Sequence, residues 1–485
     1  MKVLFAASEI SPYASTGGLA DIAKALPDAL ARLDVEVIRV IPCYRQIMER
    51  NRNLRDTQLR LQIPVGLSNH TAEVWLDEVD FPKTYYIRRD EFFDRTFLYG
   101  LSTRDYDDNF ERFTFFQKAV IALIDTLKIK PDIVHCNDWQ TGLLPLFLRH
   151  GINGGGRAQS ERTVYTIHNL AYQGVYPGSS FPVSNLPFSC YNMYEMEYYN
   201  QLNCMKAGIV VSQYATTVSK TYATEIRTEE HGCGLHGVLM DKGDKLVGIL
   251  NGVDYSEWNP ETDQYIAKNY SADKPEGKLA CKKDLLQLAG LDVDIERPLI
   301  GMVTRLAEQK GLDILAQAIE KIMEHDVSLI VLGTGQQKYH DLCTEWAERW
   351  KKRFVARLEY NTELSHKIEA GSDMFLMPSR FEPCGLNQLY SLRYGAIPIV
   401  HATGGLKDTI RNCCDEAGNA ISNGNGFVFE QYSGEALHNA LQMALKKHAD
   451  KTFWQSLMSR NMREEHSWDH AAREYLDVYK KALAL

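Results

Sequence analysis

The sequence predicts an α/β fold made of two doubly wound domains. Short apolar, β-branched segments recur along the chain, and many are followed by segments with helical periodicity. That alternation is typical of parallel sheets covered by helices on both faces. The chain has 485 residues, and single hydrophobic cores stop growing near about 250–300 residues. The strands should therefore divide between two cores.

The expected strands fall into two sets, one in each half of the chain. The first set is residues 3–7, 35–41, 133–136, 163–167, 216–218 and 246–250. The second set is residues 299–303, 329–332, 354–358, 374–377 and 397–400. Near-continuous apolar segments of this length indicate strands that are buried on both faces.

The boundary between the two sets is expected at Asn251-Gly252, because Asn-Gly marks a turn and a polar stretch follows it. We expect residues 1–250 to form the first domain and residues 255–467 the second. A helical pattern at 468–485 should complete the first domain, although the pattern alone does not fix where this helix packs.

Composition excludes several classes of protein. The chain has 54 Lys and Arg residues against 63 Asp and Glu residues, a net charge of −9, whereas proteins built around nucleic acid are usually basic. Its ten cysteines include no C-x-x-C pair, so neither a zinc ribbon nor a thioredoxin-type site is supported. There is no signal-peptide pattern, and no apolar stretch reaches the roughly 18 residues of a membrane span. We expect a cytoplasmic protein without nucleic-acid or membrane partners.

One short motif occurs twice, as 16–21 (TGGLAD) and 403–408 (TGGLKD). Each copy follows an apolar strand and precedes a helical pattern. Adjacent glycines let the backbone approach a ligand closely, and a helix N-terminus attracts phosphate. A single copy would be explained by a tight turn. Two copies, one in each expected domain, indicate a phosphorylated ligand.

Two cations, Arg305 and Lys310, come just after the strand expected at 299–303. Ligands of open α/β sheets bind beyond the carboxyl ends of the strands. Cations near a helix N-terminus oppose the helix dipole, so a bound anion explains them better than a solvated helix start. A diphosphate leaving group is the anion that this pair would stabilise.

Three further groups of polar residues follow predicted strands. Glu382 precedes a turn that opens a helix at 385–387, where it is either a site residue or an ordinary helix N-terminal charge. Asp138 and Trp139 end the strand at 133–136, and His168 ends the next strand, so Asp138 and His168 should lie close together. Tyrosines 191, 194, 198 and 199 form an aromatic patch for which core packing is the favoured role in most cases.

Two weaker patterns do not predict a site. Gly333-Thr334-Gly335 begins a dinucleotide fingerprint that the following residues do not complete. Asp105 and Asp107 are expected in a solvated loop, and no His/Glu cluster has the spacing of metal ligands. We therefore expect no metal.

Taken together, the blocks of sequence resemble bacterial glycogen synthases and plant starch synthases, the glycosyltransferase family that uses ADP-glucose. The resemblance covers nearly the whole chain. It rests on residues 8–9, 17–21, 137–139, 166–174, 206–208, 251–254, 305–313 and 379–386.

The resemblance implies a GT-B fold, with two Rossmann-like domains and the active site in the cleft between them. It implies transfer of glucose from ADP-glucose to the non-reducing end of an α-1,4-glucan, with retention of configuration, in glycogen biosynthesis. ADP-glucose is a co-substrate, and no cofactor or metal is expected because Arg305 and Lys310 act at the diphosphate.

The resemblance also assigns roles to residues. The catalytic set is Glu382, Asp138, His168, Arg305 and Lys310. The donor-binding set adds Ser15, Gly17, Gly18, Asn251, Tyr360, Cys384, Gly385, Leu386, Asn387, Thr403 and Gly404. The acceptor or sugar-binding set is Trp139, Asp21 and Tyr172.

This chain departs from the family pattern at three places. Ser15 stands where the family usually has a lysine that contacts the donor, Asn387 replaces a usual threonine, and residues 137–140 (NDWQ) stand where many bacterial members have His-Asp-Trp-His. Tyr390 occupies the position of the second glutamate of the wider E-x7-E pattern, as expected for this family. The Ser15 change leaves open a transferase of the same fold that uses UDP-glucose. A catalytically weak glucan-binding protein is the other alternative, and the intact catalytic set argues against it. A glucan phosphorylase and a nicotinamide dehydrogenase fit less well, because their cofactor motifs are missing or incomplete.

Overall fold

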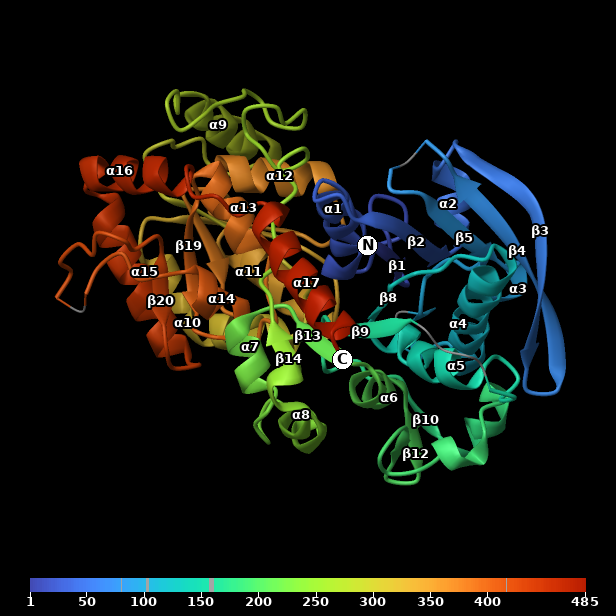
Figure 1. Cartoon of the computed structure of the whole chain (residues 1–485). Helices are drawn as coiled ribbons and strands as arrows, with labels where there is room; N and C mark the ends of the chain where they lie inside the picture. The colour runs from blue at the N-terminus through green and yellow to red at the C-terminus, as the bar shows by residue number, and fades with distance from the viewer. Residues whose placement is uncertain (80, 102–103, 157–160, 416) are drawn as a thin grey trace. The chain divides into compact units, whose positions relative to one another are not determined.

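The computed structural model describes residues 1–79, 81–101, 104–156, 161–415 and 417–485. The chain divides into two compact units. Unit 1 comprises Met1–Asn251 together with Trp468–Leu485, and unit 2 comprises Gly252–Ser467. Both are α/β, with parallel sheets flanked by helices, so the predicted fold class is confirmed (Figure 1).

The described residues of unit 1 form a nine-stranded sheet in the order β14-β13-β9-β8-β1-β2-β5-β4-β3. Pairing from β14 to β5 is parallel, and β5-β4-β3 is antiparallel. The strand bounds are β1 Lys2–Ala6, β2 Glu36–Pro42, β3 Leu54–Val65, β4 Ser68–Asp77, β5 Thr84–Arg88, β8 Ile133–Asn137, β9 Arg162–Ile167, β13 Tyr214–Thr217 and β14 Leu246–Gly248.

Strands β3, β4 and β5 were not predicted from the sequence. In β4 buried and half-buried residues alternate, as expected for a strand with one solvated face. The polar residues at every second position interrupt the continuous apolar run by which the other strands were recognised. Two smaller sheets were also missed: β10 Val175–Pro177, β12 Gln201–Asn203 and β11 Glu197–Tyr198 form one, and β6 Gly100–Leu101 pairs with β7 Arg104–Asp105 in the other.

Helix α17 (Trp468–Leu483), at the C-terminus, packs in unit 1 beside α1 (Gly18–Ala31), as Figure 1 shows. An ion pair of 2.8 Å joins Arg32 to Asp469, and the Tyr479 hydroxyl lies 2.7 Å from the His135 ring on β8. The other helices of unit 1 are α2 Arg45–Arg50, α3 Asp90–Phe93, α4 Asn109–Thr126, α5 Leu144–His150, α6 Cys204–Val211, α7 Lys220–Glu225 and α8 His236–Lys242, with 3-10 turns η1 Trp139–Thr141, η2 Gly178–Ser184, η3 Phe188–Cys190 and η4 Gly243–Lys245.

The described residues of unit 2 form a six-stranded parallel sheet in the order β17-β16-β15-β18-β19-β20. The strands are β15 Leu299–Val303, β16 Ser328–Leu332, β17 Phe354–Arg357, β18 Met374–Met377, β19 Ile397–His401 and β20 Phe427–Phe429. The unit also contains the 3-10 turn η5 Glu308–Lys310 and the helices α9 Gly277–Ala289, α10 Leu312–Glu324, α11 Gln337–Arg349, α12 Thr362–Gly371, α13 Asn387–Tyr394, α14 Gly404–Thr409, α15 Gly434–His448 and α16 Lys451–Asn461.

Strands β15, β16, β18 and β19 of unit 2 are almost completely buried, as their apolar sequences predicted. Ile300, Leu329, Met374 and Ile399 are inaccessible to solvent and belong to one core. Their sequence neighbours belong to a second core: Leu299, Ile330, Phe375 and Val400. Burial of such side chains contributes about 1.5–3 kcal/mol each. Among the described residues of either unit, no helix is long and apolar enough to span a membrane.

Candidate active site

In unit 2 a half-buried ion pair links the loops that follow two neighbouring strands. The Lys310 ammonium nitrogen, in the loop after β15, lies 2.6 Å from a carboxylate oxygen of Glu382, in the loop after β18. The Ser379 hydroxyl donates to the same oxygen at 2.9 Å. Only 6% of Glu382 is exposed. Two catalytic residues expected from the sequence are therefore in direct contact.

Arg305, in the same loop as Lys310, is exposed. Its guanidinium lies 3.4 Å from the Gln309 side-chain oxygen. The Gln309 side-chain nitrogen donates to the Phe381 carbonyl at 3.2 Å, and the Gln309 backbone carbonyl accepts from the Arg380 amide at 2.8 Å. These bonds tie the loop that bears both cations to the loop that bears Glu382.

Glycines make this close approach of loops possible. Gly311 (φ +76°) and Gly404 (φ +45°) adopt left-handed backbone conformations. A Cβ atom would lie 1.9 Å from the Pro378 carbonyl oxygen at Gly311, and 1.9 Å from the Glu382 carbonyl oxygen at Gly404. The Gly405 amide donates to that same Glu382 carbonyl at 3.1 Å. The second Gly-Gly motif therefore holds the backbone of Glu382 as well as opening α14.

The segment from Cys384 to Asn387 leads into α13, as expected. Gly385 has φ +73°, and α13 begins at Asn387. The Asn387 side chain donates to the Val303 carbonyl at 2.7 Å, so it fastens the start of α13 to the end of β15. Cys384 is buried, and Leu386 is half-buried.

Two other expected donor-binding residues of unit 2 differ in their exposure. Thr403 is buried, directly before Gly404. Tyr360 is 83% exposed, just before the Asn361 cap of α12.

In unit 1 the backbone of Asp138 is strained. It follows β8 with φ +55° and ψ −176°, close to a region that is essentially restricted to glycine. Its carboxylate accepts a hydrogen bond of 2.8 Å from the His168 amide, and its own amide donates to the Thr166 carbonyl. Burial raises the pKa of Asp138 to about 7. Strain and a raised pKa are both common at functional sites.

The geometry around His168 defines its tautomer. Its Nε2 lies 2.9 Å from the Asn137 side-chain oxygen, which accepts because the Asn137 amide nitrogen donates to the Ala6 carbonyl. Nε2 therefore carries the hydrogen, and Nδ1 presents a lone pair. That Nδ1 is buried and has no hydrogen-bond partner among the described residues. Burial lowers the pKa of His168 to about 3, so the ring is a neutral acceptor for a hydroxyl group.

The first Gly-Gly motif is held by Glu9, a residue for which no role in the site was predicted. The buried Glu9 carboxylate accepts from the Thr16 amide, the Thr16 hydroxyl and the Tyr99 hydroxyl, each at 2.7 Å. Burial raises its pKa against the effect of these bonds. Its position three residues after the buried strand β1 was the available signal. Asn137, which orients His168, was also missed.

The residues around this motif are accessible. Ser15, Gly17 and Gly18 are exposed, and α1 begins at Gly18 with Asp21 in its first turn. The Ser15 hydroxyl lies 3.5 Å from the Gly17 carbonyl oxygen.

The expected sugar-binding residues Trp139 and Tyr172 lie in very different surroundings. Trp139 is only 8% exposed, its ring packs edge-on against Phe113, and a Cβ atom at Gly174 would lie 2.6 Å from it. The indole is thus a packing element that offers little surface to a ligand. Tyr172 is half-exposed. The Asn251 side-chain oxygen is buried without a hydrogen-bond partner among the described residues.

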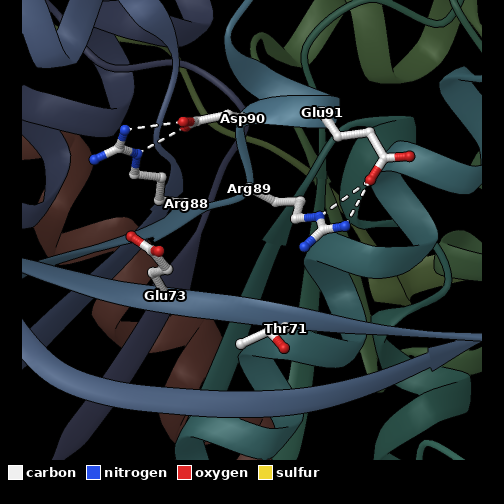
Figure 2. A pocket seen from close by; sticks show the side chains of 6 residues that line it. All are labelled: Thr71, Glu73, Arg88, Arg89, Asp90 and Glu91. Carbon is white, nitrogen blue, oxygen red and sulfur yellow. Dashed lines mark hydrogen bonds and ion pairs between the residues drawn. The ribbon is translucent and has the colours of Figure 1, made fainter.

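A pocket of about 230 Å³ lies in unit 1 away from these residues (Figure 2). Two ion pairs line this pocket, one between Arg88 and Asp90 and the other between Arg89 and Glu91. Thr71 and Glu73 on β4 complete the lining. None of the expected site residues lines it.

Over the described ranges, no group of three or more His, Cys, Asp or Glu side chains has the arrangement of a metal site.

Comparisons with known proteins cover the whole chain. The family described as "Starch synthase catalytic domain" matches residues 2–241, and "Glycosyl transferases group 1" matches residues 289–462. A glycogen synthase of Koribacter versatilis is 44% identical, with 99% of this chain and 98% of the relative covered. A glycogen synthase of Syntrophotalea carbinolica is 41% identical, with 100% and 99% covered.

A solved structure is similar over the same length. The catalytic domain of starch synthase IV from Arabidopsis thaliana, bound to ADP and acarbose, has a TM-score of 0.92 and 32% identity, with 100% of this chain and 99% of that chain covered. A sucrose-phosphate synthase from Thermosynechococcus elongatus has a TM-score of 0.61 at 15% identity, which shows a shared fold.

Proposed function

The chain belongs to the glycogen synthase and starch synthase family of glycosyltransferases, and from this premise we propose its reaction. It transfers glucose from ADP-glucose to the non-reducing end of an α-1,4-glucan, and the configuration at the anomeric carbon is retained. The donor, the stereochemistry and independence from a metal are parts of this proposal.

One observation carries the choice of ADP-glucose. The Arabidopsis starch synthase IV structure, which is similar to this chain over its full length, is bound to ADP and acarbose. The strand-end loops of unit 2 have the chemistry that an ADP diphosphate requires. They supply the cations Arg305 and Lys310, and the backbone amides at the start of α13.

The two cations are proposed to act as the leaving group departs. Negative charge grows on the diphosphate while the bond to the anomeric carbon breaks. Positive groups that are already in place stabilise that charge without reorganisation. Lys310 is held in place by Glu382, whose carboxylate also accepts a hydrogen bond from Ser379, and the Arg305 loop is held by Gln309. With two positive charges at the diphosphate, a divalent metal is not needed, so we propose that the reaction is metal-free.

The unit 1 residues are proposed to act on the sugar. His168 Nδ1, a buried lone pair without a partner among the described residues, is suited to accept a hydrogen bond from a glucose hydroxyl. Asp138 carries a carboxylate next to the His168 backbone. Its negative charge favours the positive character that develops at the anomeric carbon.

The test is extension of a short acceptor. The protein is incubated with maltotriose and ADP-glucose, and the products are followed by ¹H NMR. The proposal predicts ADP release together with new α-1,4 linkages, with α-linked glucosyl groups as the first product. ADP release without chain extension, or a first product with β-linked glucose, contradicts it. Arg305→Ala/Lys310→Ala serves as the inactive variant. Lys451→Ala, which removes a lysine paired with Glu296 at the surface, is the matched control.

A further inference from the structure

We propose that the hairpin tip at Tyr199 is a non-catalytic binding platform for α-glucan chains. The inference rests on the proposed function, because it takes the polymeric acceptor of that reaction as the ligand. The hairpin consists of β11 and β12, and Tyr198 pairs with Gln201 across a two-residue turn. The turn residues are Tyr199 and Asn200.

The backbone of this turn is unfavourable for an aromatic residue. Tyr199 has φ +50° and Asn200 has φ +64°. Two-residue hairpin turns with positive φ at both positions favour Asn, Asp and Gly, and a bulky residue there is an outlier. Asn200 fits this preference, whereas Tyr199 does not. A residue with a strained backbone at an exposed turn points to a use for its side chain.

The Tyr199 ring is exposed and yet held in place. It is 80% exposed, and it packs against Tyr198 in an edge-to-face contact with ring centroids 4.9 Å apart. Tyr198 is itself held by a close contact with Gly234. A Cβ atom added at Gly234 would lie 2.1 Å from the Tyr198 hydroxyl oxygen. An aromatic ring that is already ordered loses little conformational entropy when a ligand stacks on it.

Other exposed residues of the same segment could also contact a ligand. Tyr194 is 76% exposed and lies in the turn that precedes β11. The Lys206 ammonium group donates to the Met193 and Glu197 carbonyls, each at 2.6 Å, and so ties this turn to the base of the hairpin. Asn200 and Gln201, the two residues that follow Tyr199, are exposed and carry side-chain amides. Rings that stack on sugar faces, next to amides that bond hydroxyl groups, suit a carbohydrate.

The local charge identifies the class of carbohydrate. Glu197 lies within the hairpin, where its carboxylate accepts from the Asn200 amide at 2.7 Å, and Glu195 lies nearby in the preceding turn. Glu195 is paired with Arg149 at 2.9 Å, and the Lys206 ammonium group lies beside Glu197. The local charges are therefore balanced and offer little attraction to phosphorylated or other anionic ligands. A neutral glucan needs no such attraction. The platform therefore selects uncharged chains rather than nucleotides or nucleic acid.

The experiment measures binding in the absence of any donor. Native gel electrophoresis with increasing glycogen in the gel compares the full-length protein with Tyr199→Asn. Asparagine suits the turn better than tyrosine, so we expect the melting temperature to stay the same or rise. We expect glycogen binding to weaken roughly three- to ten-fold, as for the loss of one stacking contact. Tyr199→Phe keeps the ring and should keep most of the binding.

Lys352→Asn is the matched control. Lys352 also has positive φ (+66°) at an exposed position, in unit 2. Replacing Lys352 with asparagine relieves a similar backbone strain and should leave glycogen binding unchanged.

Three results would overturn the proposal. Unchanged glycogen binding by Tyr199→Asn would show that the ring has no such role. Weaker binding accompanied by a lower melting temperature would show that Tyr199 is structural. A change in sedimentation without glycogen would show that the tip joins two copies of the chain. Because no donor is present, a failure of the proposed transfer reaction would leave the outcome of this experiment unaffected.

Discussion

Lys310 and Glu382 form an ion pair across two neighbouring strand-end loops of unit 2, with 2.6 Å between the ammonium nitrogen and a carboxylate oxygen. The pair fixes the cation before any donor binds. It also means that a diphosphate would meet a lysine whose charge is already partly compensated. The interaction gained from Lys310 should therefore be larger in the transition state, where the phosphate charge is greatest, than in the ground state.

Arg305→Ala and Lys310→Ala should each lower kcat as well as weaken donor binding. Loss of one preorganised charge-stabilising group typically costs about 10² to 10³ in kcat. Steady-state kinetics with ADP-glucose and glycogen measure both parameters. Full kcat with only a raised KM in both variants would show that the cations bind substrate without stabilising the transition state.

Lys310→Ala also leaves the Glu382 carboxylate without its cation, so some loss of stability accompanies the kinetic change. Loss of such a bond costs about 1–3 kcal/mol. The kinetics are therefore measured well below the melting temperature, and Lys451→Ala provides the reference for removal of a surface lysine.

Activity should survive EDTA. The proposed reaction uses Arg305, Lys310 and backbone amides at the diphosphate, in place of the oxygen-ligated Mg²⁺ that many nucleotide-dependent enzymes use. Initial rates are compared before and after extensive dialysis against EDTA. A loss of turnover that Mg²⁺ or Mn²⁺ restores would overturn the metal-free part of the proposal.

Ser15→Lys should tighten donor binding. Ser15 is exposed, two residues before Gly17, so a longer side chain has room there. The expected gain is about 1 kcal/mol, or a few-fold to ten-fold in Kd, because charge-assisted bonds are stronger than neutral ones. Ser68→Lys adds the same charge at another exposed position. Equal or weaker binding by Ser15→Lys, relative to this control, would mean that the loop is adapted to serine.

Asp138→Asn should be more stable than the parent protein above pH 7. The Asp138 pKa is about 7 in the folded protein and about 3.9 in an unfolded chain. The folded protein therefore binds this proton more tightly. The stability from this tighter binding is present below about pH 4 and is lost as the pH rises to 7, by at most about 1.4 kcal/mol per pH unit. Asparagine does not titrate and so avoids this loss.

Urea denaturation at several pH values between 4.5 and 8 measures the difference in unfolding free energy between the two proteins. The difference should grow in favour of Asp138→Asn up to pH 7 and then level off. Asp107→Asn, at an exposed position, should show no such trend. A constant difference across the range would contradict the raised pKa.

The parallel strands were predictable because their burial on both faces leaves a continuous apolar signature. The proximity of Asp138 and His168 was predictable for a related reason. Strands β8 and β9 are neighbours with Asn137 opposite Thr166, so the residues that follow them share one sheet edge. By contrast, the antiparallel strands β3 and β4 alternate in burial and lack that signature.

Features that depend on contacts between distant parts of the chain could not be predicted. Glu9 holds the first Gly-Gly motif together with Tyr99, which lies 90 residues away in the sequence. The burial of Trp139 follows from its packing against Phe113 and the bare backbone of Gly174. No local pattern contains either partner, so neither role is visible before the fold is known.

The central claim is that this chain uses ADP-glucose to extend an α-1,4-glucan. Its most direct test is the ratio of kcat/KM for ADP-glucose to that for UDP-glucose, measured with the full-length protein and glycogen as acceptor. The account predicts nucleotide release that requires glycogen, glucose incorporated in equal amount, and a ratio well above one. Turnover of UDP-glucose in preference to ADP-glucose, or glycogen-independent release of nucleotide, would contradict it.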